Sequence, residues 1–384
     1  MKVWLAGLLC SVVTSLVLAQ ASAPASAADE GWQQCAQQSH DATARLDCYD
    51  RWAQQQRRNA APASAPGDAA PSPPSPPSPP LSAAQAGPDT ARTPDCRSGP
   101  HTTLSRYWEL EPGSDCGRFS IRGYKPISLS WVRGDSVNTA PSSSASGRTA
   151  STAQPYVRDE MRIQLSVRTK IASGLLPMLP DDQRDSLWFG YTQQSYWQLF
   201  NGDLSRPFRT TDHEPELMYI VPTPLALPGG WRLRYSGLSL NHQSNGQTLP
   251  QSRSWNRAIL MGGMELGDRY SVTGRVWKRI SDGDGNSSNP AAGDDNPGIE
   301  NYVGRAEVTG SWQIRPGHTL ALTVRHSLRS EANGSWRLDW LRAVDDLSTG
   351  LQLHVQLFSG YGDAMVDFNR RRTTLSVGLS LVDW

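Results

Sequence analysis

The chain of 384 residues carries a formal net charge of +1, so its composition gives no reason to expect a polyanionic partner such as nucleic acid. Its hydrophobic residues make up 38% of the sequence, but beyond the first twenty positions they never form the run of about 18 that a transmembrane helix requires. Trp and Tyr, 14 and 11 residues against 6 Phe, suit membrane–water interfaces, where a polar ring atom contacts water. The composition therefore disfavours a helical membrane protein and remains compatible with a membrane β-barrel, in which only every second residue faces lipid.

The N-terminus has the features of a cleaved secretory signal. Lys2 precedes an apolar run over residues 3–18, and small-residue motifs predict cleavage near residue 23 or 27, so residues 1–27 are expected to be a signal peptide. Cys10 would leave with this segment. The four remaining cysteines are an even number in an oxidising compartment, which predicts two disulfides. Of the three possible connectivities we favour the pairs nearest in sequence, Cys35–Cys48 and Cys96–Cys116.

Residues 28–58 have a helical pattern rich in Gln, Ala and Arg. Thirteen residues separate the two cysteines of this segment, about 20 Å along a single helix, which is too far for a disulfide. If they pair, the segment consists of two short helices that turn near residues 39–41. The Ala-, Pro- and Ser-rich run over residues 59–95 predicts a disordered or polyproline-like linker. The sequence thus predicts a small helical, disulfide-bonded module, with no catalytic pattern, linked to a larger domain over residues 96–384.

Alternation of apolar and polar residues dominates the chain from Met161 onward, as in residues 163–168, 351–357 and 375–381. Such alternation is typical of strands with one face toward lipid and the other toward a hydrated or hydrogen-bonded interior. About eleven segments have it, and a further start near residues 128–131 gives about twelve. The predicted fold is all-β, a twelve-stranded antiparallel transmembrane β-barrel with a short N-terminal periplasmic helical extension. The Ser-, Ala- and Thr-rich residues 137–153 are expected to form a mobile loop.

Residues 238–260 combine this alternation with the residue types of a hydrolase. A hairpin that turns near residue 249 would pair His242 with Asn256 and Ser244 with residue 254, with opposed Cβ atoms about 4.5–5.5 Å apart. These are a nucleophile, a base and an orienting group within reach of one another. His242 continues the leucine side of its strand, the side that faces lipid in a membrane barrel, so the substrate would itself be a lipid. A neutral Asn suits this position because an ionised carboxylate facing lipid is costly.

Four ordered motifs carry a family resemblance. The run from His242 to Gly246, followed by Ser252–Arg257, resembles the active-site hairpin of the outer membrane phospholipase A family, and residues 191–199, 207–215 and 359–363 resemble other stretches of it. The resemblance covers roughly residues 105–384. It implies a barrel of the bacterial outer membrane that hydrolyses acyl esters of phospholipids and lysophospholipids (phospholipase A1, phospholipase A2 and lysophospholipase activity). Ser244 would be the nucleophile, His242 the base and Asn256 the residue that orients the base.

The same resemblance implies a Ca²⁺ cofactor and a homodimer as the active form. The backbone N–H of Gly246 and a calcium-bound water would stabilise the oxyanion. Calcium would bind the carbonyl of Gln247, the side chain of Ser252 and a carbonyl near Arg206 of a second subunit. Gln247 and Arg206 occupy positions often held by arginine and serine; a backbone ligand tolerates such changes, although the charge of Arg206 could weaken the ion's binding. Gln193 matches a polar position at the dimer interface, with an inward-facing barrel residue as the alternative.

Other readings of the sequence are possible. An aspartate-rich stretch invites a calcium-loop interpretation, but its spacing lacks the ligand order of an EF-hand, so a solvated outer loop is expected; the residues are Asp282, Asp284, Asp294 and Asp295. Neither Gly-x-Ser-x-Gly nor His-Glu-x-x-His occurs. The alternative function is a catalytically silent barrel that acts as a channel or anchor. Such a barrel has no reason to carry the set of His242, Ser244 and Asn256.

Overall fold

The computed structural model describes residues 35, 42–59, 96, 99, 101–180, 183–280, 293–344 and 350–381. It divides the chain into two units, Met1–Ala86 and Gly87–Trp384. In the first unit, helix α2 (Ala42–Asn59) carries Cys48, which forms a disulfide with Cys35 across a Cα–Cα distance of 5.5 Å. The favoured pairing is therefore confirmed. The signal segment, the turn near residues 39–41 and all but the first residue of the linker lie outside the described residues.

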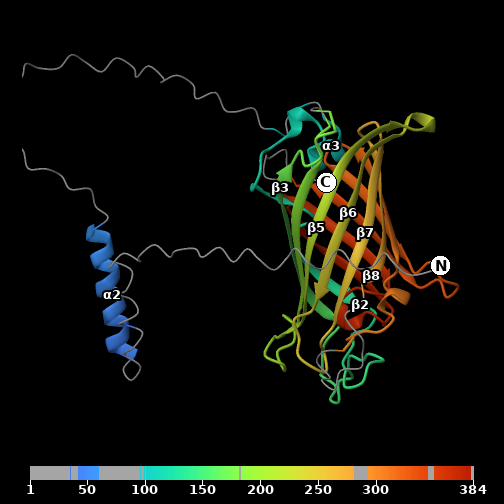
Figure 1. Cartoon of the computed structure of the whole chain (residues 1–384). Helices are drawn as coiled ribbons and strands as arrows, with labels where there is room; N and C mark the ends of the chain where they lie inside the picture. The colour runs from blue at the N-terminus through green and yellow to red at the C-terminus, as the bar shows by residue number, and fades with distance from the viewer. Residues whose placement is uncertain are drawn as a thin grey trace, which may run out of the picture. The chain divides into compact units, whose positions relative to one another are not determined.

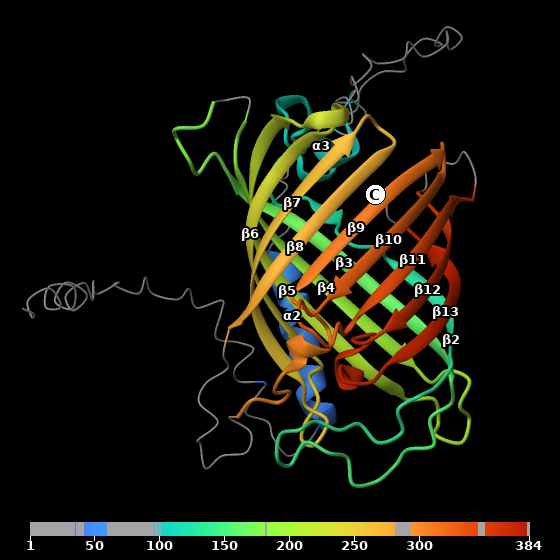
Figure 2. The same cartoon turned by 90° about the vertical axis from the view of Figure 1, so that its right-hand side faces the viewer.

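The second unit is a closed antiparallel barrel (Figure 1, Figure 2). Within the described residues, strands β2 to β13 each pair with the next along the chain, and β13 closes the ring onto β2. This confirms the twelve-stranded prediction. A short strand, β1 (Ile121–Gly123), pairs with β3 beyond the end of β2. The strands of the ring are β2 (Ser128–Gly134), β3 (Asp159–Ser173), β4 (Ser186–Trp197), β5 (Phe208–Ala226), β6 (Arg232–Ser244), β7 (Ser254–Leu266), β8 (Tyr270–Ile280), β9 (Ala306–Arg315), β10 (His318–His326), β11 (Gly334–Ala343), β12 (Gln352–Gly360) and β13 (Arg372–Ser380).

The apolar sides of the strands face outward, as the alternation predicts. Leu238 and Leu240 of β6 and Leu260 of β7 each expose more than half of their surface, which a soluble protein would not leave as a continuous patch. The same outer face carries large apolar side chains on most other strands. None of the helices in the described part of the chain is long and apolar enough to cross a membrane.

The interior contains apolar clusters in addition to the predicted hydrogen-bonded side chains. Helix α3 (Thr103–Trp108) enters one end of the barrel (Figure 1). There Leu104 and Trp108 pack with Trp188 and other buried apolar side chains. The disulfide Cys96–Cys116, the second predicted pair, lies in the segment that contains this helix. A second apolar cluster includes residues of the short helices η4 (Ile299–Asn301) and η5 (Met365–Asp367). Segments outside the strands therefore supply apolar contacts that strand alternation does not reveal.

The loop over residues 137–153 is folded against the barrel, so the expectation of a mobile loop is wrong. Asn138 donates from Nδ2 to Oδ1 of Asp367 at 2.9 Å, and Arg148 forms an ion pair with Asp295 at 2.7 Å. All four side chains are buried. Small polar residues in this loop allow close packing, and two long-range contacts hold it in place.

Candidate active site

Strands β6 and β7 place the predicted catalytic residues in the expected register. His242 pairs with Asn256 and Ser244 with Ser254 across the ladder, and a loop over residues 245–253 joins the strands. The register matters because a slip of one residue would turn every side chain to the opposite face. His242 and Ser244 therefore lie on the outer face, in line with Leu240.

The side chain of Asn256 contacts the imidazole of His242. Nδ1 of His242 lies 2.8 Å from Oδ1 of Asn256. Because an amide oxygen only accepts, Nδ1–H donates this bond and Nε2 keeps the lone pair of the neutral ring. Within the described part of the chain, Ser244 Oγ makes no hydrogen bond with His242, so the serine stands two residues along the strand with its hydroxyl unengaged. Catalytic hydrogen bonds are often open in the absence of substrate.

The loop after Ser244 is shaped by Asn245 and Gly246. The buried side chain of Asn245 accepts from the N–H of Arg253 at 2.9 Å and donates to the carbonyl of Gln251 at 2.7 Å, which ties the two sides of the loop together. Gly246 has a φ of +60°, the left-handed conformation that favours glycine. A Cβ at this position would meet only His213, at 3.7 Å, so conformation and not space requires the glycine.

Ser252 contacts an acidic group that sequence reasoning placed in solvent. Ser252 Oγ donates to Oδ2 of Asp295 at 2.6 Å, and Asp295 also pairs with Arg148. Asp295 exposes only 9% of its surface, so the expectation of a solvated loop is wrong for this residue. Arg253, fully buried, donates from Nη2 to the carbonyl of Arg148 at 3.0 Å. Asp294 pairs with Arg279 at 2.5 Å, and Asp282 and Asp284 lie outside the described residues.

The two remaining predicted positions belong to β4 and to the loop between β4 and β5. Gln193 is on the outer face of β4, where its side-chain amide lies 3.3 Å from Tyr191 Oη and 3.3 Å from Ser195 Oγ. Its sequence neighbours on the strand, Thr192 and Gln194, line the interior cavity. The inward-facing alternative for Gln193 is therefore wrong. The carbonyl of Arg206 accepts a hydrogen bond from the indole N–H of Trp197 at 2.9 Å, which uses one of its two lone pairs.

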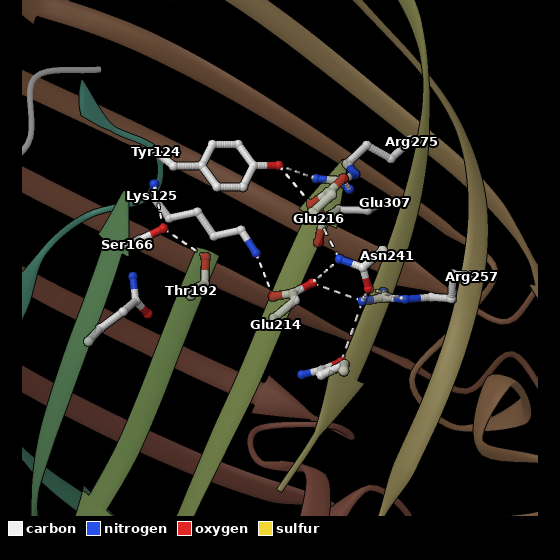
Figure 3. A network of polar contacts seen from close by, with 12 residues as sticks. Tyr124, Lys125, Ser166, Thr192, Glu214, Glu216, Asn241, Arg257, Arg275 and Glu307 are labelled. Carbon is white, nitrogen blue, oxygen red and sulfur yellow. Dashed lines mark hydrogen bonds and ion pairs between the residues drawn. The ribbon is translucent and has the colours of Figure 1, made fainter. Parts of the chain in front are cut away.

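The inner face of strands β5, β6 and β7 carries a dense polar network (Figure 3). Arg257 donates to Oε1 of Glu214 at 2.8 Å and to Oδ1 of Asn241 at 3.0 Å, and Lys125 pairs with Glu214 at 2.7 Å. Asn241 and Arg257 each stand next in sequence to a predicted catalytic residue. They hold the strands from inside while their neighbours face lipid. No sequence motif assigns a role to Asn241 or Arg257; the signal that could have indicated them is their place among the polar members of the alternation.

Comparisons with known proteins agree with this geometry. The family model of phospholipase A1 matches residues 104–381. A putative phospholipase A1 of Neisseria meningitidis is 34% identical over 287 residues, which cover 74% of this chain and 71% of that protein. Phospholipase A1 of Escherichia coli is 34% identical over 230 residues, or 59% of this chain and 71% of that protein.

Solved structures show the same similarity. Outer membrane phospholipase A of Escherichia coli aligns with a TM-score of 0.59 and 28% identity, covering 70% of this chain and 94% of that one. The dimer of the Salmonella typhi outer membrane phospholipase with bound calcium aligns with a TM-score of 0.58 and 28% identity, over 69% and 93% of the two chains. The family model covers well over half of the sequence, including both strands of the candidate site. This chain therefore belongs to the phospholipase A1 family.

Proposed function

We propose that Ser244, His242 and Asn256 hydrolyse acyl esters of phospholipids and lysophospholipids at the outer face of this barrel. Membership of the phospholipase A1 family makes the chain a phospholipid-hydrolysing esterase of the bacterial outer membrane; the proposal adds the residues and their roles. The observation that carries it is the 2.8 Å contact between His242 and Asn256, with Ser244 next on the same lipid-facing side. An active site for a water-soluble substrate would lie in the hydrated interior of the barrel. A lipid substrate instead reaches the outer face from the membrane.

The mechanism follows the chemistry of a serine triad. Ser244 Oγ attacks the ester carbonyl while Nε2 of His242 takes the hydroxyl proton. Asn256 keeps the ring in the tautomer whose Nε2 can accept that proton. The tetrahedral intermediate collapses to an acyl-serine as His242 returns the proton to the departing lipid alcohol. A water molecule, activated by the same histidine, then releases the fatty acid and restores Ser244.

The developing negative oxygen needs donors at the loop. The backbone N–H of Gly246, at the start of the left-handed turn, is our candidate for one of them. Gly246 lies in the loop that begins directly after the strand carrying Ser244, so its N–H is close to the nucleophile. Asn245 fixes this turn through its two loop contacts, which keeps the donor in place before the reaction begins.

The residues present fit a calcium ion. Ser252 Oγ and the carbonyl of Gln247 are oxygen donors of the kind that Ca²⁺ prefers, and the carboxylate of Asp295 adds negative charge 2.6 Å from Ser252 Oγ. The carbonyl of Arg206 from a second subunit would complete the proposed set. Calcium bound there would help to stabilise the oxyanion as a Lewis acid. In the described part of the chain no group of three or more His, Cys, Asp or Glu side chains forms a competing metal site.

Dimerisation is part of the proposal. The outer face of β6 bears exposed leucines beside His242, and Gln193 of β4 offers a polar group on the same side of the barrel. A second copy would cover this face, form walls for the acyl chain and bring its Arg206 to the site. The Salmonella typhi relative crystallised as a dimer with calcium, which supports this arrangement by analogy.

The channel alternative is less well supported. Helix α3 places Leu104 and Trp108 in the barrel mouth, where they pack with Tyr235 and Met261 of the wall. An apolar cluster of this kind obstructs passage of hydrated solutes. The channel alternative also does not explain why His242, Ser244 and Asn256 lie together on the lipid face.

The test is fatty-acid release from phospholipid micelles by the purified protein. Ser244→Ala should lower kcat by roughly 10³-fold or more, because it removes the nucleophile. The matched control is Ser236→Ala, a serine on the same strand and the same face, which should keep near-wild-type turnover. A Ser244→Ala variant that releases fatty acid at the wild-type rate would rule out this triad.

A further inference from the structure

A second histidine lies beside Ser244. His213 of β5 pairs with Ser244 across the ladder, and on its other side it pairs with Gln193 of β4. Ser244 thus has His242 two residues along its own strand and His213 directly opposite on the neighbouring strand. Opposed residues on one face have Cβ atoms about 4.5–5.5 Å apart, so the imidazole is within reach of whatever binds Ser244.

The ring of His213 has a defined orientation. Its Nδ1 lies 2.7 Å from Tyr191 Oη, and Tyr191 pairs with Pro215, farther from the active-site loop than His213 itself. The opposite edge of the ring faces the loop, since a Cβ on Gly246 would lie 3.7 Å from both Cδ2 and Nε2 of His213. Nδ1 is therefore held by a residue farther from the active-site loop, and Nε2 points toward that loop.

This arrangement parallels that of the predicted base. In both histidines Nδ1 contacts a fixed polar partner, Asn256 for His242 and Tyr191 for His213, while Nε2 is left for another group. Tyr191 Oη has a single proton, and it lies nearer to Nδ1 of His213, at 2.7 Å, than to the amide of Gln193, at 3.3 Å. Because the proton is donated to the nearer acceptor, Nε2 of His213 carries the ring proton and is a hydrogen-bond donor. A polar side chain held in this way on a lipid-facing surface indicates a functional contact, because burial in lipid would otherwise penalise it.

The geometry determines which part of the substrate can meet this donor. If acyl chains lie along the apolar outer face, over Leu240 and Leu238, the polar headgroup lies toward the loop end of β6. The phosphate of a glycerophospholipid is only a few bonds from its acyl esters. Nε2 of His213 faces that end of the site.

We infer that His213 binds the phosphate of the phospholipid whose ester Ser244 attacks, with Nε2–H donating to an anionic phosphate oxygen. This inference rests on the proposed function and adds a specificity-determining contact to it. A hydrogen bond to an anionic oxygen is stronger than one between neutral groups and does not require a charged imidazole. Tyr191 acts as a positioning residue, because it sets the tautomer and the direction of the ring without reaching the substrate.

The test compares a phospholipid with a diacylglycerol that has the same acyl chains, since the two differ by the phosphate headgroup. His213→Ala should lower kcat/KM for the phospholipid about tenfold more than for the diacylglycerol, the loss expected for one charge-assisted hydrogen bond. His213→Gln places an amide N–H at a similar reach and should restore part of the difference. Tyr191→Phe should give a smaller loss with the same preference, because the ring remains but its tautomer is no longer held.

A second measurement does not depend on hydrolysis of the neutral lipid. An alkylphosphocholine and an alkyl glucoside of equal chain length both occupy the acyl site, but only the first has a phosphate. His213→Ala should raise the inhibition constant of the alkylphosphocholine about tenfold and leave that of the glucoside near its wild-type value. Equal changes for both members of either pair, or no change for any of the four amphiphiles, would overturn the inference. An active Ser244→Ala variant would instead refute the proposed function, so the two failures are distinguishable.

Discussion

The two faces of strands β5 to β7 are built differently although their residues alternate one by one. On the inner face, Asn241 and Arg257 are almost fully buried and share hydrogen bonds with Glu214 (Figure 3). On the outer face, His242 is exposed and its described partner is the single side chain of Asn256. The inner face gives the strands one fixed geometry, and the outer face uses that geometry for chemistry. Substitutions that act on only one of these two properties can test the comparison.

The largest difference between loss of activity and loss of stability is expected for the variants His242→Ala and Asn241→Ala. His242→Ala should lower kcat by roughly 10⁴-fold, because it removes the base. It should change the free energy of unfolding by no more than about 0.5 kcal/mol, because the side chain is exposed. Asn241→Ala should instead cost about 1–3 kcal/mol of stability, since Arg257 and Glu214 each lose a buried hydrogen bond to the Asn241 amide. Fatty-acid release and urea unfolding in micelles measure the two properties, and equal destabilisation by both variants would contradict the division of roles.

The interior carboxylate of Glu216 should give the next largest effect. It accepts from Ser239 Oγ at 2.5 Å and Tyr124 Oη at 3.0 Å and pairs with Arg275. Glu216→Ala leaves a buried guanidinium without this partner and should lower the free energy of unfolding by about 3–5 kcal/mol. Glu216→Gln keeps an acceptor and should cost less. If the Ala variant unfolds at the same midpoint denaturant concentration as the wild type, the inner network does not stabilise the barrel.

Removal of the orienting amide should have an intermediate effect on catalysis. Asn256→Ala should reduce kcat roughly 10²-fold, because His242 loses the acceptor that fixes its ring. Asn256→Asp retains an acceptor oxygen at the same reach and is expected to keep more activity. Steady-state kinetics on phospholipid micelles decides between them. If the two variants are equally impaired, the acceptor is not what Asn256 contributes.

Ser252→Ala should alter the calcium requirement more than the saturated rate. The variant loses the side-chain ligand, so its half-saturating calcium concentration should rise about tenfold. Ser254→Ala is the matched control, because Ser254 also donates to Asp295 but at 3.3 Å and is not a proposed ligand. A calcium titration of hydrolysis is to be run beside cross-linking in the same detergent. Full activity of a monomer in excess chelator would disprove the calcium-linked dimer.

The smallest effect is expected from the N-terminal unit. Deletion of residues 29–94 removes α2 and the disulfide Cys35–Cys48 but leaves the barrel and Cys96–Cys116. Heat-modifiable migration and micellar activity should match the full chain, because this unit forms its own contacts. Loss of folding in the truncated protein would show that the extension contributes to barrel stability.

Strand alternation predicted much of the fold and the pairing of His242 with Asn256. Both follow from local rules, because consecutive strands joined by a hairpin pair with each other and period-2 alternation assigns the faces. The proximity of His213 to Ser244 could not be predicted in this way. The pairing of β5 with β6 has an irregularity between Pro222 and Leu225, which shifts the register along the rest of the two strands.

The acidic neighbour of Ser252 was missed for a related reason. Asp295 is 43 residues away in sequence and reaches the site through a loop whose path depends on its ion pair with Arg148. Neither the alternation of the strands nor the spacing of the aspartates encodes that path. Helix α3 was similarly hidden, because a short segment before the first strand gives no signal that it enters the barrel.

The one-by-one alternation of β6 between Leu238 and Ser244 also limits how this gene can change in length. A codon inserted or deleted between the codons of Leu238 and Ser244 would shift the downstream residues by one position and place Asn241 or Gln243 in lipid. Two codons gained or lost together would restore the faces and change only the depth of the site in the bilayer. We therefore expect length variation in these strands to accumulate in steps of two residues, with unrestricted steps confined to the loops.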